Sequence, residues 1–231
     1  MVGFNATAVL PQNFQPNWNS KCVLWLRADL GTTIATGVST WLDKSSNSYS
    51  FTQATGSAQP TLNTSDSSYN KQATLSFNSA ASQYVRATVT TLPQPYTCLV
   101  VGENSSGSTQ AQFNGWIGNN TGPYWTGTQW GLYAGVGFSV TNTVTTKQAQ
   151  AAVFNTTTSA IYINNSQTAA GTGSAGATSG GAALTIGANA ASASPLNGKV
   201  AEMIVISSAL TTSQIKEIFA YFGARYNIST S

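Results

Sequence analysis

The chemistry open to this sequence is limited by how few of its side chains ionise. Its 231 residues include nine Lys or Arg, six Asp or Glu, and no His. Without His, neither a Ser-His-Asp nor a Cys-His system can form. The six acids are Asp29, Asp43, Asp66, Glu103, Glu202 and Glu217. The shortest separation between any two is the 14 positions from Asp29 to Asp43. Glycoside hydrolysis uses two carboxylates roughly 5–10 Å apart, so it would need acids from different strands.

Two of these acids are predicted to be structural. Glu202 lies in an apolar run, where an unpaired charge is costly, and its candidate partners are Arg27, Arg225 or backbone amides. Asp43, followed by Ser45, is predicted to cap a turn, because calcium sites usually gather several carboxylates. We therefore expect no catalytic residue, no metal ion and no cofactor.

Both cysteines lie in apolar surroundings. Cys22 precedes Val-Leu-Trp, and Cys98 precedes Leu-Val-Val. The pattern favours two buried thiols that act as small core residues. A disulfide between them is the alternative.

Aromatic side chains concentrate between residues 113 and 133. They are Phe113, Trp116, Tyr124, Trp125, Trp130 and Tyr133. Trp116 and Trp130 are predicted to be largely core. Tyr124 and Trp125 are predicted to be exposed, because the Gly- and Asn-rich segment before them is typical of a loop.

The candidate ligand-binding residues are Tyr124, Trp125, Asn119, Asn120 and Gln129. Aromatic rings can stack on the C–H faces of sugar rings, while amide side chains pair with sugar hydroxyls. Trp and Tyr also suit protein interfaces, because they bury a large area and keep a polar atom. A glycan and a protein surface are therefore both open as partners of this segment.

Strands dominate the elements that must position these side chains. Short runs rich in Val, Ile, Thr and aromatics recur between Gly, Asn, Pro and Ser clusters. The predicted strands are 22–27, 73–77, 83–89, 96–102, 130–140, 148–154, 159–163, 183–187 and 199–206. A tight hairpin is predicted after Ile163, where Asn164 tolerates a positive φ. The low-complexity segment 171–181 is predicted to be a flexible surface loop.

One helix is predicted at the C-terminal end, over 212–226. Thr211 and Gln214 have the spacing of a capping box, and Leu210 and Ile215 that of a hydrophobic staple. Apolar residues from Ile215 onward recur at helical spacing, which predicts one stripe that packs on the sheet.

Several motifs resemble one known family. They are Leu24–Asp29 (LWLRAD), Val38–Asn47 (VSTWLDKSSN), Tyr69–Phe77, Ile161–Asn164, Leu184–Gly187, Leu196–Ile206 and Ala209–Thr211. In order and spacing these residues resemble a concanavalin A-like, laminin G-like domain over about 22–228. The resemblance implies an all-β jelly-roll sandwich of two antiparallel sheets with one C-terminal helix. Fold does not determine function, and the family includes lectins, glycosidases, lyases, adhesins and virion proteins.

The resemblance divides the chain into a domain over 21–231 and an N-terminal segment over 1–20. That segment carries Phe4, Phe14 and Trp18 together with two prolines, which disfavour helix. We predict an extended arm that either covers its own sandwich or docks on a partner.

Composition narrows the function. Only 6% of the residues are charged and the net charge is +3, which is too weak a positive field for nucleic acid. No run approaches the roughly 18 apolar residues of a membrane span, and the first residues do not match a secretory signal. The sequence favours a non-enzymatic virion surface protein, a phage capsid decoration or fibre component made in the host cytoplasm. Its partners would be capsid or other virion proteins, further copies of itself, or a cell-surface glycan.

Two other classes of function stay open. One is a secreted, extracellular carbohydrate-binding module or adhesin. The other is a polysaccharide hydrolase or lyase, which the spacing of the acids and the lack of His disfavour.

Overall fold

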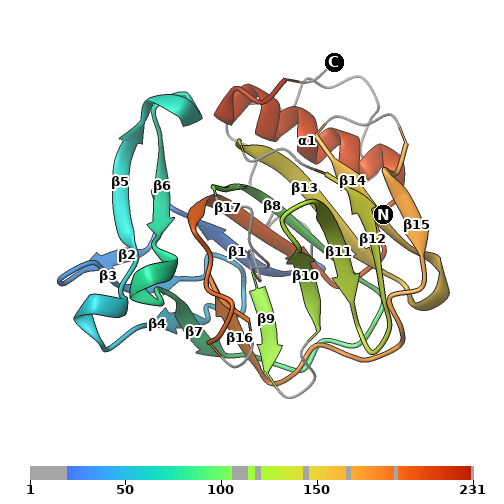
Figure 1. The fold of residues 1–231 in the computed structure, drawn as a ribbon, viewed down its shortest axis with the longest axis horizontal. Coiled ribbons are helices and arrows are strands. Elements are labelled where there is room, and N and C mark those ends of the chain that lie inside the picture. Colours follow the sequence, from blue (N-terminus) through green and yellow to red (C-terminus); the bar gives the residue numbers. More distant parts are fainter. Residues whose placement is uncertain are drawn as a thin grey trace.

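Two layers of antiparallel strands face each other across the core of the protein (Figure 1). The computed structural model describes residues 20–105, 114–117, 121–142, 146–164, 168–189 and 192–229. The predicted sandwich with one C-terminal helix is confirmed. Nearly all of the predicted N-terminal arm lies outside the described residues.

The larger layer, here called the large sheet, contains eight of the described strands. Its central strand is β17 (Gly198–Ile206), which pairs with β8 (Tyr96–Asn104) along one side. On its other side β17 pairs with β6 (Gln72–Phe77) and then with β1 (Cys22–Arg27). The remaining strands are β13 (Gln148–Phe154), β14 (Ser159–Ile163) and β15 (Gly171–Gly173) beyond β8, and β5 (Thr61–Asp66) beyond β6.

The opposite layer has two parts. The first, here called the opposing sheet, contains six described strands: β2 (Thr32–Ile34), β3 (Val38–Leu42), β4 (Ser50–Thr52), β7 (Val85–Thr88), β16 (Ala183–Ile186) and β9 (Asn114–Ile117). The second, here called the meander, is β10 (Gly122–Trp125), β11 (Gln129–Tyr133) and β12 (Gly137–Thr141). Short 3-10 turns lie at Gly56–Ala58, Ser67–Tyr69, Ser79–Ala81 and Thr156–Thr158.

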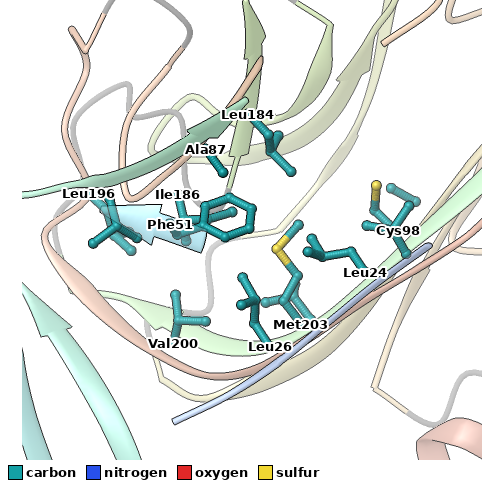
Figure 2. Close-up of a cluster of buried hydrophobic side chains, with 14 of the residues drawn as sticks. Leu24, Leu26, Phe51, Ala87, Cys98, Leu184, Ile186, Leu196, Val200 and Met203 are labelled. Carbon is teal, nitrogen blue, oxygen red and sulfur yellow. The ribbon is translucent and has the colours of Figure 1, made fainter. Parts of the chain in front are cut away.

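The main core fills the space between the layers. Because side chains alternate across a strand, Leu24 and Met203 of the large sheet point toward Phe51 and Leu184 of the opposing sheet (Figure 2). All four are almost completely buried. Strand pairing and apolar burial therefore select the same register.

The helix α1 (Thr212–Tyr226) covers the outer face of the large sheet (Figure 1). The predicted capping box is present: the Gln214 backbone N–H donates to Thr211 Oγ1 at 3.3 Å, and the Thr211 N–H donates to Gln214 Oε1 at 2.9 Å. The predicted apolar stripe is buried against the sheet from Ile215 to Phe222. Both bounds of this prediction are confirmed.

The two cysteines are buried thiols that form no disulfide with each other, as the favoured interpretation predicts. Cys22 belongs to the apolar cluster beneath the helix, whereas Cys98 belongs to the core between the layers. Burial, and then the nearby Asp43 carboxylate, raise the pKa of the Cys22 thiol to about 12. Both thiols therefore act as packing groups.

Two local predictions are wrong. The run 130–140 is two strands, β11 and β12, which reverse at Gly135 with φ +99°. The segment 171–181 is packed structure: β15 pairs with β14, and Phe138 and Val140 pack over Gly171 and Gly173. Its glycines reflect close approach by neighbouring side chains, which composition alone does not distinguish from flexibility.

Gly176 offers a test of this packing. Its φ is +88°, and a Cβ there would lie 2.2 Å from the Ala134 carbonyl oxygen. We expect Gly176→Ala to lower the free energy of unfolding by about 2 kcal/mol or more, from the left-handed backbone and the clash together. Ala177→Ser, at an exposed neighbouring residue, should change it by less than about 0.5 kcal/mol. Equal denaturation midpoints for the two variants would contradict the packed segment.

Candidate functional site

The predicted exposed aromatic pair is divided between the two faces of the meander. Trp125 is fully buried, so the prediction that it is exposed is wrong. It lies directly opposite Trp130 in the β10–β11 register, and the two indole rings meet edge to face at 6.4 Å. Both rings face the core because strand pleating turns Trp125 away from the side that Tyr124 occupies. Trp130 is buried as predicted.

Tyr124 and Gln129 do share the outer face of the meander. The Tyr124 ring lies over Gly131, where a Cβ would approach its Cζ to 2.2 Å. Ser139 Oγ donates to Gln129 Oε1 at 3.0 Å. Tyr133, which is not one of the predicted ligand-binding residues, is 39% exposed on the same face. Its alternation with Trp130 and Leu132 along β11 is the signal that could have placed it there.

The other predictions for this segment are not covered by the structure. Asn119 and Asn120 lie outside the described residues, and so does the side chain of Trp116.

Glu202 is completely buried between the large sheet and the helix, as a structural role predicts. Its carboxylate accepts hydrogen bonds from Trp25 Nε1 at 2.7 Å, Tyr221 OH at 2.9 Å and Tyr226 OH at 2.7 Å. The predicted partners Arg27 and Arg225 pair with Asp29 instead. Burial raises the pKa of Glu202, although these three donors oppose the shift.

Asp43 organises a turn, as predicted. Its carboxylate accepts hydrogen bonds from the backbone N–H groups of Trp25 and Ser45, each at 2.8 Å, and from Ser45 Oγ at 2.6 Å. These contacts tie the segment after β3 to β1.

One pair of acids does come together across strands. Lys199 Nζ lies 2.9 Å from Asp66 Oδ2 and 3.6 Å from Glu103 Oε1, so the two carboxylates lie no farther apart than the roughly 5–10 Å of glycosidase pairs. Asp66 also accepts from Ser68 N and Thr74 Oγ1, and these donors and Lys199 hold its pKa below the usual value despite burial. A general acid needs a raised pKa, so Asp66 is held as the ionised partner of Lys199 and does not suit that role.

A polar groove of about 610 Å³ lies on the outer face of the opposing sheet. It is lined by Ser50, Thr52, Gln53, Ala54, Tyr84, Arg86, Ala87, Thr88 and Ala183. Because Phe51, Val85 and Leu184 point into the core, pleating turns their strand neighbours outward. The groove was not predicted from the sequence.

Arg86 is held in a defined position in this groove. Its Nε donates to Thr185 Oγ1 at 2.9 Å, its Nη2 donates to Ser192 Oγ at 2.6 Å, and its guanidinium lies 5.2 Å from the centre of the Tyr84 ring. Hydrogen bonds from Gln53 and Ser192, and the Arg86 charge, keep the pKa of Tyr84 below its ordinary value despite its partial burial. The site therefore combines a positive charge, an aromatic ring and hydroxyl groups.

The sequence held a weak signal for this groove. Val85-Arg86-Ala87-Thr88 alternates apolar and polar residues, which predicts that Arg86 and Thr88 face away from the core. The pattern does not show which strands lie next to this one in the sheet. Thr52 and Thr185 flank Arg86 in the sheet register, but they lie far from it in the chain.

Within the described ranges, no three His, Cys, Asp or Glu residues gather as a metal site would require. Among those same residues, no helix combines the length and apolar character needed to span a bilayer.

Comparison with known proteins identifies one matching family and several solved structures of similar fold. The family model described as the concanavalin A-like lectin/glucanases superfamily matches residues 70–216. No curated protein sequence matches the chain.

Among solved structures, one similar chain comes from a structure titled "Cell entry of botulinum neurotoxin type C is dependent upon interaction with two ganglioside molecules". Its TM-score is 0.63 at 13% sequence identity, and the match covers 89% of this chain and 52% of that one. A second is the botulinum neurotoxin serotype D ligand binding domain with N-acetylneuraminic acid (TM-score 0.60, 12% identity, 87% and 51%). A third is Trypanosoma rangeli sialidase (TM-score 0.60, 12% identity, 87% and 33%). The present chain spans about half of each toxin chain and a third of the sialidase chain. At these identities the likeness is one of fold.

Proposed function

The chain belongs to the concanavalin A-like lectin/glucanase superfamily, and from this premise we propose that it is a non-enzymatic attachment domain that binds glycans. The observation that carries the proposal is the groove on the opposing sheet. Its lining offers the Tyr84 ring for contact with sugar C–H groups, and the hydroxyls of Ser50, Thr52 and Thr88 for sugar hydroxyls.

The structural neighbours support this class of ligand. The titles of two of them name gangliosides and N-acetylneuraminic acid. A jelly-roll fold shared with those toxin domains makes glycan binding a natural use of the same scaffold, although fold alone does not assign it.

The composition of the groove supports binding without turnover. Among the described residues that line it, none is Asp or Glu. One exception among glycosidases is a tyrosine nucleophile, and Tyr84 has a lowered pKa. A tyrosine nucleophile still needs a base to accept its proton and an acid for the leaving group, and the lining supplies neither. Sialoside hydrolysis is therefore the competing activity to assay.

We further propose that the domain is displayed on a virion surface. The low charge of the sequence and its two buried thiols, which form no disulfide with each other, support this, because disulfides are rare in proteins made in a reducing cytoplasm. Capsid proteins or further copies of the chain are the proposed partners. Mass spectrometry of density-purified particles would detect the chain at fixed stoichiometry, whereas its recovery from cell-free medium alone would favour a secreted adhesin.

A second surface is proposed for accessory contacts. Tyr124 and Gln129 lie on the outer face of the meander beside Tyr133. This face offers aromatic area with hydroxyl and amide groups, which suits a sugar or a protein partner.

The groove can be tested by filling it. Thr52 is exposed and lines the groove, so we expect Thr52→Trp to weaken glycan binding at least about tenfold. Thr61→Trp places the same ring at an exposed position on β5 of the large sheet and should leave affinity unchanged. Binding is measured on an immobilised glycan array of neutral and acidic sugars, followed by calorimetry on the strongest ligand.

The same array separates the alternatives. Loss of binding in Tyr124→Ala but not in Thr52→Trp would move the site to the meander. Release of free sialic acid from a fluorogenic sialoside, abolished in Tyr84→Phe, would overturn the non-enzymatic proposal. No binding to any glycan by the unsubstituted protein would overturn the function itself.

A further inference from the structure

The groove on the opposing sheet carries a single formal charge. Of the described residues that line it, Arg86 alone is ionic, and the others are Ser, Thr, Gln, Tyr or Ala. The formal charge of the described lining is therefore positive. A concave surface lined by one sign of charge favours ligands of the opposite sign.

The arrangement of Arg86 favours a particular kind of anion. A guanidinium is a planar fork that matches the two oxygens of a carboxylate. The contacts with Thr185 and Ser192 and the Tyr84 ring fix that plane. They use N–H groups of Nε and Nη2, so a carboxylate would approach the Nη1 end of the guanidinium. A cation that is already ordered loses little conformational entropy on binding.

The surroundings of Arg86 indicate that the anion belongs to a sugar. Thr40, Thr52, Arg86 and Thr185 form one row across four adjacent strands. Thr52 and the neighbouring Thr88 are exposed, so their hydroxyls lie beside the cation and face solvent. Thr185 is completely buried beneath Arg86, so a ligand on this surface meets the guanidinium and the exposed hydroxyls of Thr52 and Thr88. One negative group beside sugar hydroxyls suits that combination.

The number of charges limits the ligand further. Sulfated polymers with several anionic groups are matched by clusters of basic residues, whereas one cation lines this groove. One positive charge fits one negative charge.

We propose that the groove binds a sugar bearing a single carboxylate, such as a sialic or uronic acid, with Arg86 as the partner of that carboxylate. This inference rests on the proposed glycan-binding function. It adds the charge class of the ligand and the residue that selects it.

The test uses matched ligands and matched variants on the full chain. The probes are sialyllactose, its carboxylate methyl ester, lactose, a glucuronic acid disaccharide and a heparin oligosaccharide. The variants are Arg86→Gln and Arg86→Lys, with Lys71→Gln as the control for the same loss of charge at an exposed residue. Affinities are measured by calorimetry, and melting temperatures verify folding.

We expect the protein to bind sialyllactose or the glucuronic acid disaccharide at least about tenfold more tightly than the ester or lactose. Arg86→Gln should remove this preference and leave weak binding of the neutral sugars. Arg86→Lys should keep part of the preference for the acidic sugars, because lysine keeps the positive charge but lacks the planar guanidinium. Lys71→Gln should behave as the unsubstituted protein.

Three results would overturn the inference. Equal affinity for lactose and sialyllactose, abolished by Thr52→Trp, would leave glycan binding standing and remove its charge class. Preference for heparin would replace the carboxylate with a polyanion. Absence of binding to every probe and every array glycan would remove the proposed function as well. Should Arg86→Gln fail to fold, the comparison of acid and ester on the unsubstituted protein still decides the question.

Discussion

Replacing Glu202 by leucine is expected to lower the free energy of unfolding by about 3 kcal/mol or more. The substitution removes the acceptor of Trp25 Nε1 and of the Tyr221 and Tyr226 hydroxyls, and each buried donor left without a partner costs about 1–3 kcal/mol. Relief of the buried charge offsets part of this cost. Urea denaturation measures the difference.

Glu202→Gln is the matched control. Its amide oxygen can accept from Trp25, and the two tyrosine hydroxyls can rotate to accept from its NH₂ group. We expect a loss of about 1 kcal/mol. A leucine variant as stable as the glutamine variant would contradict the assignment of Glu202 as the centre of this network.

The same residue predicts a pH dependence. Burial raises the pKa of Glu202 above its ordinary value of 4.5, so the folded state holds this proton more tightly than the unfolded state. The associated stability is complete below the ordinary value and is lost as pH rises through the raised value. The stability of the unsubstituted protein relative to Glu202→Gln should therefore fall as the pH rises above 4.5 and level off once the pH exceeds the raised pKa of the folded state. A stability difference that stays constant above pH 4.5 would contradict the raised pKa.

Replacing Trp125 by alanine is expected to destabilise the protein by about 3–5 kcal/mol. The ring is fully buried and packs edge to face on Trp130, and removal of a buried Trp leaves a large cavity. For a chain of this size the melting temperature should fall by roughly 6–20 °C. Differential scanning calorimetry measures both quantities.

Tyr124→Ala distinguishes the two neighbours. Its half-buried ring covers Gly131 on the outer face of the meander, so we expect a loss of about 1 kcal/mol. A Trp125→Ala variant with unchanged melting temperature and lost ligand binding would show that this ring is at the surface after all. The two substitutions must therefore be made separately, because a double variant would combine a core defect with a surface change.

Local sequence predicted the helices and strands whose capping residues and apolar patterns lie within one short stretch of the chain. The capping box at Thr211 and the apolar stripe after Ile215 defined α1, because a helix makes its hydrogen bonds within a few residues. The strands β1, β13 and β14 were predicted with the bounds that the structure has. The order of the family-like motifs predicted the sandwich.

Short polar strands were harder to predict. β4 and β5 are largely Ser, Thr and Asn with few buried residues, so no apolar period marks them. The glycine-rich β15 lacks an apolar side-chain signal, and the side chains that pack over it, Phe138 and Val140, come from β12.

The sequence by itself determined the fold class, the terminal helix, the burial of both cysteines and the structural use of Glu202 and Asp43, because apolar periodicity and the cost of unpaired charge act locally. Only the tertiary structure decided which aromatic of a neighbouring pair reaches solvent, since one step along a strand reverses the face. It also decided the groove: Arg86 and Thr185 are 99 positions apart in the chain and 2.9 Å apart in space. Strand pairing over that separation depends on the packing of the whole sandwich, so the groove exists only once the sheets have formed.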